Sequence, residues 1–124
     1  MKKLRLAVFA IVFFAAFVFF GNVGTVRAQS MEWNGTVDDV VQIRIRNRNA
    51  RSTAISGRAY YDDNFNFNGR APRENANASV DKRDGRGKIY VVQQPNRRNN
   101  FTTIVEIVDK KGGPDRYRFT LNWN

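Results

Sequence analysis

The chain has 124 residues and carries 21 Lys and Arg residues against 11 Asp and Glu residues, with no histidine and no cysteine. The missing residue types exclude Ser-His-Asp and Cys-His catalytic arrangements, the usual zinc ligand sets and disulfide bonds. A chain of this length supports one domain.

The N-terminal segment, residues 1–28, has the composition of a secretion signal. A positively charged start with Lys2 and Lys3 precedes an apolar run over residues 6–20, and Val26 and Ala28 form a small-x-small cleavage pattern. We therefore expect a signal peptide with an apolar signal helix, cleaved after Ala28 and typical of bacterial Sec export. The protein is then secreted or periplasmic.

An uncleaved N-terminal membrane anchor is the alternative interpretation of this segment. The apolar run of 15 residues spans roughly 22 Å as a helix at about 1.5 Å per residue, whereas a bilayer core needs about 20 residues. Cleavage is therefore favoured. We expect contact with a membrane only through this segment, and only if it is retained.

Residues 29–124 are expected to form one all-β domain, because their apolar residues are mostly branched at Cβ. They include eight Val and six Ile but a single leucine, Leu121. Branching at Cβ suits a pleated sheet better than a helix. Four of the 21 basic residues and none of the 11 acidic residues precede residue 29, so this domain carries a net charge of about +6.

The first strands of the domain are marked by turn residues and by alternation. A short first strand is expected over residues 31–37, closed by Asp38 and Asp39, and residues 40–46 alternate between apolar and polar side chains. A turn follows at residues 47–49, Asn-Arg-Asn. The alternation places Val41, Ile43 and Ile45 inward and Gln42, Arg44 and Arg46 outward.

The middle of the domain is less regular. A weaker strand is expected over residues 52–60, where Gly57 indicates a bulge or a close backbone approach. A brief strand over residues 64–68 ends in an Asn-Gly turn, and residues 70–77 are expected to form a loop.

The last third of the domain indicates a meander. A strand over residues 78–82 is followed by Asp84-Gly85, a hairpin turn signal, and by a second strand over residues 88–94. Residues 101–109 are apolar on both faces, which indicates a central strand. Residues 116–123 alternate, with the aromatic residues and Leu121 facing inward. The strands from residue 88 onward are expected to pair as a three-stranded meander.

Together these patterns predict about seven strands with turns at regular intervals. Such spacing is typical of a small antiparallel β-sandwich or barrel. No segment of residues 29–124 shows apolar residues at helical spacing over three turns.

Arginines are the feature of the domain that indicates a function. They account for 13 of its 17 basic residues, and arginine binds phosphate and carboxylate groups bidentately. The candidate anion-binding residues are Arg44, Arg46, Arg48, Arg97, Arg98, Arg116 and Arg118. Rows of arginine on a sheet suit an anionic envelope polymer. The alternative is a solvated face, on which such residues pair with acidic neighbours and protect sheet edges.

We therefore expect an exported, non-enzymatic domain that acts by binding or by structural association, without cofactor, metal or catalytic residue. A net charge of +6 is modest beside that of nucleic-acid-binding domains, so nucleic acid is not the expected partner.

Two alternatives to this function stay open. One is a small carboxylate-dependent hydrolase acting on cell-wall glycan, which needs two acidic residues in one cleft. Its candidate carboxylates are Asp38, Asp39, Asp62, Asp63 and Glu106. The other is an adaptor for another exported protein, bound by strand addition to an open sheet edge.

Overall fold

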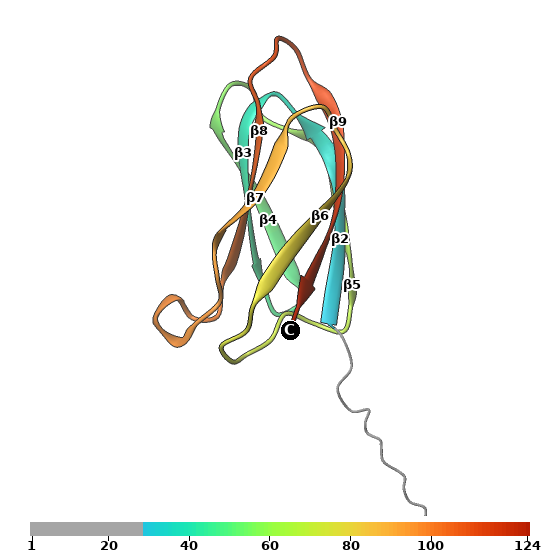
Figure 1. The fold of residues 1–124 in the computed structure, drawn as a ribbon. Coiled ribbons are helices and arrows are strands. Elements are labelled where there is room, and N and C mark those ends of the chain that lie inside the picture. Colours follow the sequence, from blue (N-terminus) through green and yellow to red (C-terminus); the bar gives the residue numbers. More distant parts are fainter. Residues whose placement is uncertain (1–28) are drawn as a thin grey trace, which may run out of the picture.

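Eight β-strands and one short 3₁₀ turn account for the regular structure of residues 29–124, the part of the chain that the computed structural model describes (Figure 1). The strands are β2 (Gln29–Val37), β3 (Asp39–Arg46), β4 (Asn49–Ser56), β5 (Tyr61–Asn68), β6 (Ala78–Asp84), β7 (Lys88–Gln93), β8 (Thr103–Asp109) and β9 (Asp115–Trp123), and the turn is η3 (Arg97–Asn99). The signal helix expected for residues 1–28 lies outside the described residues. Within residues 29–124, no helix has the length and apolar character needed to cross a membrane.

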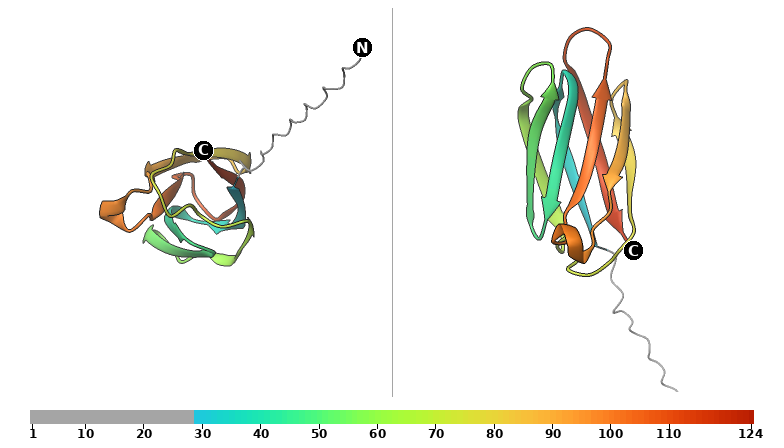
Figure 2. Two further views of the ribbon diagram at one scale, coloured as in Figure 1. Left: turned by 90° about the horizontal axis from the view of Figure 1, so that it is seen from below. Right: turned by 90° about the vertical axis from the view of Figure 1, so that its left-hand side faces the viewer.

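The strands form two four-stranded antiparallel sheets that pack face to face as a β-sandwich. One sheet has the order β5-β2-β9-β6 and the other the order β4-β3-β8-β7. Figure 2 shows the two layers curving round a shared interior. The predicted all-β sandwich is confirmed, with eight strands in place of about seven.

The core lies between the sheets and is filled by the inward members of the alternating strands. Val41, Ile43 and Ile45 of β3 are fully buried, as predicted, and the alternating residues Arg44 and Arg46 are exposed. The inward residues of β9 are buried in the same way, and Phe119 stacks on Trp33 of β2 with ring centroids 5.6 Å apart. The alternation of apolar and polar residues therefore predicted correctly which side chains of both strands face the core.

Side-chain hydrogen bonds join the two sheets where no backbone ladder does. Trp123 Nε1 donates to Thr103 Oγ1 at 3.0 Å across the buried interior. At one pair of edges, Ser52 Oγ of β4 donates to Asp63 Oδ2 of β5 at 2.7 Å. At the other pair, the amide of Gln94 exchanges two hydrogen bonds with the backbone of Ala78.

Two predicted pairings are wrong. The strands after residue 88 do not form a meander, because β8 pairs with β7 and β3 while β9 crosses to the other sheet between β2 and β6. Likewise Asp84-Gly85 does not close a hairpin, since β6 and β7 are edge strands of different sheets. In both cases the chain turns from one layer to the other, and this buries each strand's apolar face in the common core.

Several strand limits also differ from the expectation. The strand predicted over residues 52–60 is β4, which begins at Asn49, ends at Ser56 and leaves Ile55 exposed. The brief strand over residues 64–68 extends back to Tyr61 as β5. The central strand predicted over residues 101–109 is β8, and it begins at Thr103. It starts later because Asn100 and Phe101 have left-handed backbone angles that a strand cannot contain.

Candidate anion-binding site

The outer face of β3 and β4 carries a hollow of about 420 Å³ lined by three exposed arginines. They are Arg44 and Arg46 of β3 and Arg51 of β4, accompanied by the neutral polar residues Asn47, Asn49 and Thr102. The structure therefore brings the predicted residues Arg44 and Arg46 together and adds Arg51, which the sequence interpretation did not select.

The β3–β4 hairpin explains how the three arginines come together. Asn47 takes a left-handed conformation (φ 56°) in the two-residue turn, a position that asparagine tolerates. The turn sets the register so that Arg46 lies opposite Asn49 and Arg44 lies opposite Arg51. Opposite residues of an antiparallel pair point to the same face, so the arginines share one surface.

No acidic residue neutralises these three arginines. Among the residues that the structure describes, the ion pairs are Arg83–Asp81, Arg86–Asp109 and Lys110–Asp39. Glu106 of β8, which lies opposite Gln42 on the same sheet, accepts a hydrogen bond from Gln42 at 2.9 Å. Of the two features of the solvated-face alternative, the described residues supply no acidic partner for these side chains. Arg51 does lie on the edge strand β4, which is the other feature.

Positive charge is concentrated at the end of the sandwich where this hairpin turns. We define the arginine end as residues 44–51, 69–77 and 94–102, which lie together at the lower end of Figure 1. These segments contain eight arginines and one acidic residue, Glu74, whereas the rest of residues 29–124 is close to neutral. Gln29, the first described residue, lies at the same end.

Two contacts hold the segment after β5 against the hairpin turn. The backbone N–H of Ala71 donates to Asn47 O at 2.7 Å, and Arg48 Nε donates to Gly69 O at 3.1 Å. Arg48 was a predicted anion-binding residue. Its guanidinium makes this backbone contact and does not line the hollow between Arg44 and Arg51.

Two further hollows follow from this docking. One, of about 290 Å³, is lined by Arg46, Asn47, Pro72, Arg73, Asn100 and Phe101. The other, of about 250 Å³, is lined by Gln29, Arg70, Pro72, Arg73 and Glu74. Because neighbouring hollows share lining residues, the three lie side by side round the arginine end.

The predicted residues Arg97 and Arg98 lie on η3, in the segment between β7 and β8. Asn96 caps this turn, because its side chain accepts from the Asn99 N–H while the Asn99 side chain accepts from the Asn96 N–H. Both arginines are exposed at the arginine end, and neither lines the three hollows.

The predicted residues Arg116 and Arg118 lie on the opposite outer face of the sandwich, on β9. Arg118 faces Asp84 of β6 in the strand register, with Asn34 of β2 on its other side. The structure therefore does not bring this pair of arginines into one surface with Arg44 and Arg46.

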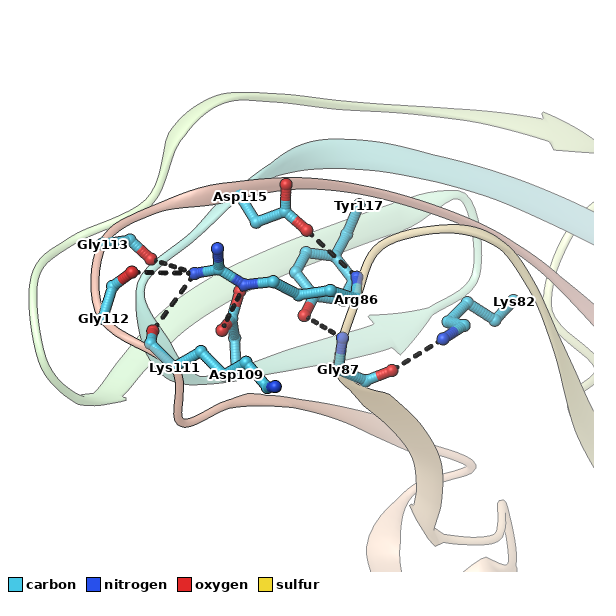
Figure 3. A network of polar contacts seen from close by, with 9 residues as sticks. All are labelled: Lys82, Arg86, Gly87, Asp109, Lys111, Gly112, Gly113, Asp115 and Tyr117. Carbon is cyan, nitrogen blue, oxygen red and sulfur yellow. Dashed lines mark hydrogen bonds and ion pairs between the residues drawn. The ribbon is translucent and has the colours of Figure 1, made fainter.

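Charged residues at the other end of the sandwich bind one another. Arg86 Nε donates to the buried carboxylate of Asp109 at 3.1 Å, and its terminal nitrogen donates to three successive carbonyls, those of Lys111, Gly112 and Gly113 (Figure 3). The hydrogen bond to Asp109 raises the pKa of Arg86 above its ordinary value.

Tyr117 is the buried centre of the same network. Its hydroxyl accepts a hydrogen bond from the Gly87 N–H at 2.6 Å. Burial, together with the nearby Asp109 carboxylate, raises the pKa of Tyr117 to about 12. Figure 3 shows this group joining the β6–β7 connection to the β8–β9 connection. The Arg86 side chain, although partly exposed, is therefore held by contacts within the fold.

The five carboxylates of the hydrolase hypothesis have separate surroundings. Asp39 accepts from Ser56 at 2.8 Å, Asp63 accepts from Ser52, and Glu106 accepts from Gln42. Asp38 lies in the bend between β2 and β3, and Asp62 lies on β5 with a left-handed backbone. None of the five lines the three hollows described above.

Three arginines that line the hollows were missed by the sequence interpretation, namely Arg51, Arg70 and Arg73. Arg51 is recoverable in principle, because a two-residue turn at Asn47-Arg48 places residue 51 opposite residue 44 by counting outward. No such rule exists for Arg73, whose position depends on the docking of residues 69–77 against the hairpin turn.

Comparison with known protein families, with curated proteins and with solved structures finds no match to this chain.

Proposed function

We propose that the chain is exported through its N-terminal segment and that its β-sandwich is a non-enzymatic binding module for an anionic polymer of the cell envelope. The arginine hollow, formed by Arg44, Arg46 and Arg51, is the binding surface. One observation carries this proposal: three arginines without an acidic partner line a single hollow.

Physical chemistry supports the proposal in two ways. Arginine keeps its charge and presents a planar fork that matches carboxylate, sulfate and phosphate groups. Placing Arg44 directly opposite Arg51 is unfavourable unless an anion lies between them, since like charges opposite each other destabilise a sheet. A bound polyanion removes that repulsion and releases its own counterions.

The test is retention on immobilised heparin, a general polyanion, as salt is raised. The variant R44T/R46T/R51T removes three charges from the hollow and keeps β-branched residues in the strands. We expect it to elute at clearly lower salt than the parent protein, because fewer counterions are released on binding.

The matched control is R83T/R116T/R118T, which removes three charges from the other sheet. We expect the control to elute close to the parent protein. Equal shifts for the two variants would mean that retention follows net charge alone and would overturn the assignment to the hollow. No retention of the parent protein at low salt would overturn the function itself.

Export is tested separately by the mass of the protein recovered outside the cytoplasm. We expect a chain that begins at Gln29. Recovery of a full-length protein that stays with the membrane would instead support the anchor alternative for residues 1–28.

A further inference from the structure

The three hollows lie in succession round the arginine end, and we call this succession the track. The first hollow shares Arg46 and Asn47 with the second, and the second shares Pro72 and Arg73 with the third. A ligand that follows this track passes from the outer face of β3 and β4 to the segment after β5. Such a path suits an extended chain molecule better than an isolated small anion.

Neutral polar side chains lie between the arginines of this track, and their hydrogen-bonding groups are unused. They are Asn47, Asn49, Asn100 and Thr102. None of these four side chains makes a hydrogen bond to another residue of the described chain. Their neighbours Asn96 and Asn99 differ, because their side chains bind the backbone of their own loop.

The mixture of charged and neutral groups discriminates between kinds of polyanion. Amide and hydroxyl side chains both donate and accept hydrogen bonds. A fully ionised polyphosphate chain, which only accepts, uses their donors and leaves their oxygens without a partner. A sugar unit carries hydroxyl groups that donate and accept, and its carboxylate suits the arginine fork. Glu74 in the third hollow only accepts when ionised, so it repels any anionic group and is matched by a sugar hydroxyl at that point.

We infer that the polymer is an acidic polysaccharide whose sugar units carry carboxylates, and that it lies along the track from Arg51 through Arg46 to Arg73. This inference rests on the proposed polyanion-binding function. The arginines bind carboxylates of successive units, and the neutral side chains bind the hydroxyl groups between them.

The test compares three probes by calorimetric titration of the domain at low salt: polygalacturonate, its fully methyl-esterified form, and inorganic polyphosphate of similar charge. We expect binding of polygalacturonate that is stronger than that of polyphosphate. We also expect loss of binding on esterification, since the ester removes the anion and keeps the sugar hydroxyls.

The variant N49A/N100G/T102V removes three of the neutral polar groups and no charge. Glycine suits position 100 because Asn100 has a left-handed backbone (φ 57°). We expect a loss of affinity for polygalacturonate of at least about tenfold. The loss for polyphosphate should be smaller, because that polymer can use only the donors of these side chains. The control N66A/S79A/N122A on the opposite outer face should bind both probes as the parent protein does.

The outcomes separate the two proposals. Equal binding of polygalacturonate and polyphosphate, with N49A/N100G/T102V silent for both, would overturn the acidic polysaccharide and leave polyanion binding intact. Failure to bind either polymer would overturn both proposals. Binding to phosphatidylglycerol vesicles without binding to either soluble polymer would also overturn both, in favour of a lipid surface.

Discussion

Arg44 and Arg51 lie directly opposite each other on the neighbouring strands β3 and β4, although both side chains are exposed and positively charged. A cross-strand pair of like charges lowers the stability of a sheet. A short polar residue at either position would relieve this repulsion. The pair therefore indicates an anion-binding site whose arginines lower the stability of the unbound sheet.

Replacing Arg51 by threonine should therefore stabilise the domain and weaken polyanion binding. We expect a gain of about 0.2–1 kcal/mol in the free energy of unfolding at low salt, because the repulsion with Arg44 is removed. Urea denaturation measures it. The gain should shrink in high salt, which screens exposed charges.

Arg118→Thr is the control for this prediction. Arg118 faces Asp84 in the strand register, so its removal should leave stability unchanged or lower it. A destabilised R51T variant would contradict the account of the Arg44–Arg51 pair.

Replacing Arg86 by methionine should destabilise the domain strongly. Asp109 is 1% exposed, and its Oδ2 atom already lacks a hydrogen-bond partner, so loss of Arg86 leaves a buried carboxylate without its cation. We expect a lower melting temperature. The comparison variant is Arg83→Met, which breaks the exposed Arg83–Asp81 pair and should change the melting temperature little. Similar small shifts in melting temperature for both variants would mean that the Arg86 contacts do not stabilise the β6–β7 and β8–β9 connections.

The buried hydroxyl of Tyr117 predicts a loss of stability at alkaline pH. The folded protein keeps this proton up to about pH 12, whereas an unfolded tyrosine releases it near pH 10. The stabilisation is therefore complete below pH 10 and falls as the pH rises towards 12, by about 2–3 kcal/mol in all.

Denaturation of the parent protein and of Tyr117→Phe between pH 9 and pH 12 isolates this effect. The phenylalanine variant lacks the hydroxyl that accepts from Gly87, so it should start less stable and lose less over the same range. Parallel pH profiles for the two proteins would exclude Tyr117 as the titrating group.

Gly85 permits the close approach of the β6–β7 connection to the ring of Tyr117. Its φ of +123° is open to glycine, and a Cβ there would collide with the tyrosine ring. We expect Gly85→Ala to lower the free energy of unfolding by more than about 1 kcal/mol. Gly112→Ala is the control, because nothing lies within 4 Å of a Cβ at that position. Thermal denaturation of both variants measures the effect, and the control should melt as the parent protein does.

The sequence predicted individual strands well because alternation reports which side chains face the core. In β3 and β9 the buried and exposed residues follow the expected order one by one. Alternation does not report which sheet a strand joins, since an inward residue is apolar in either layer. For that reason β8 and β9 were paired in the prediction although the structure separates them.

Turn residues likewise do not show whether the next strand stays in the same sheet or joins the other one. Asn47-Arg48 closes a hairpin within one sheet, whereas Asp84-Gly85 directs the chain from one sheet to the other. The second turn is held by the Arg86–Asp109 contact and by the packing of Gly85 on Tyr117. These contacts join residues more than 20 positions apart, so no local pattern reveals them. Of the candidate site, alternation identified Arg44 and Arg46, while Arg73 depended on tertiary docking.

The position of β9 has a consequence for the order in which the sandwich can assemble. This strand, residues 115–123, is the last in the chain and yet lies between β2 and β6. Until it has been synthesised, β6 has no backbone partner and Trp33 lacks the ring of Phe119 on which it stacks. Pairing between segments so distant in sequence is slow, so the sheet β5-β2-β9-β6 is completed only after residues 115–123 have been made.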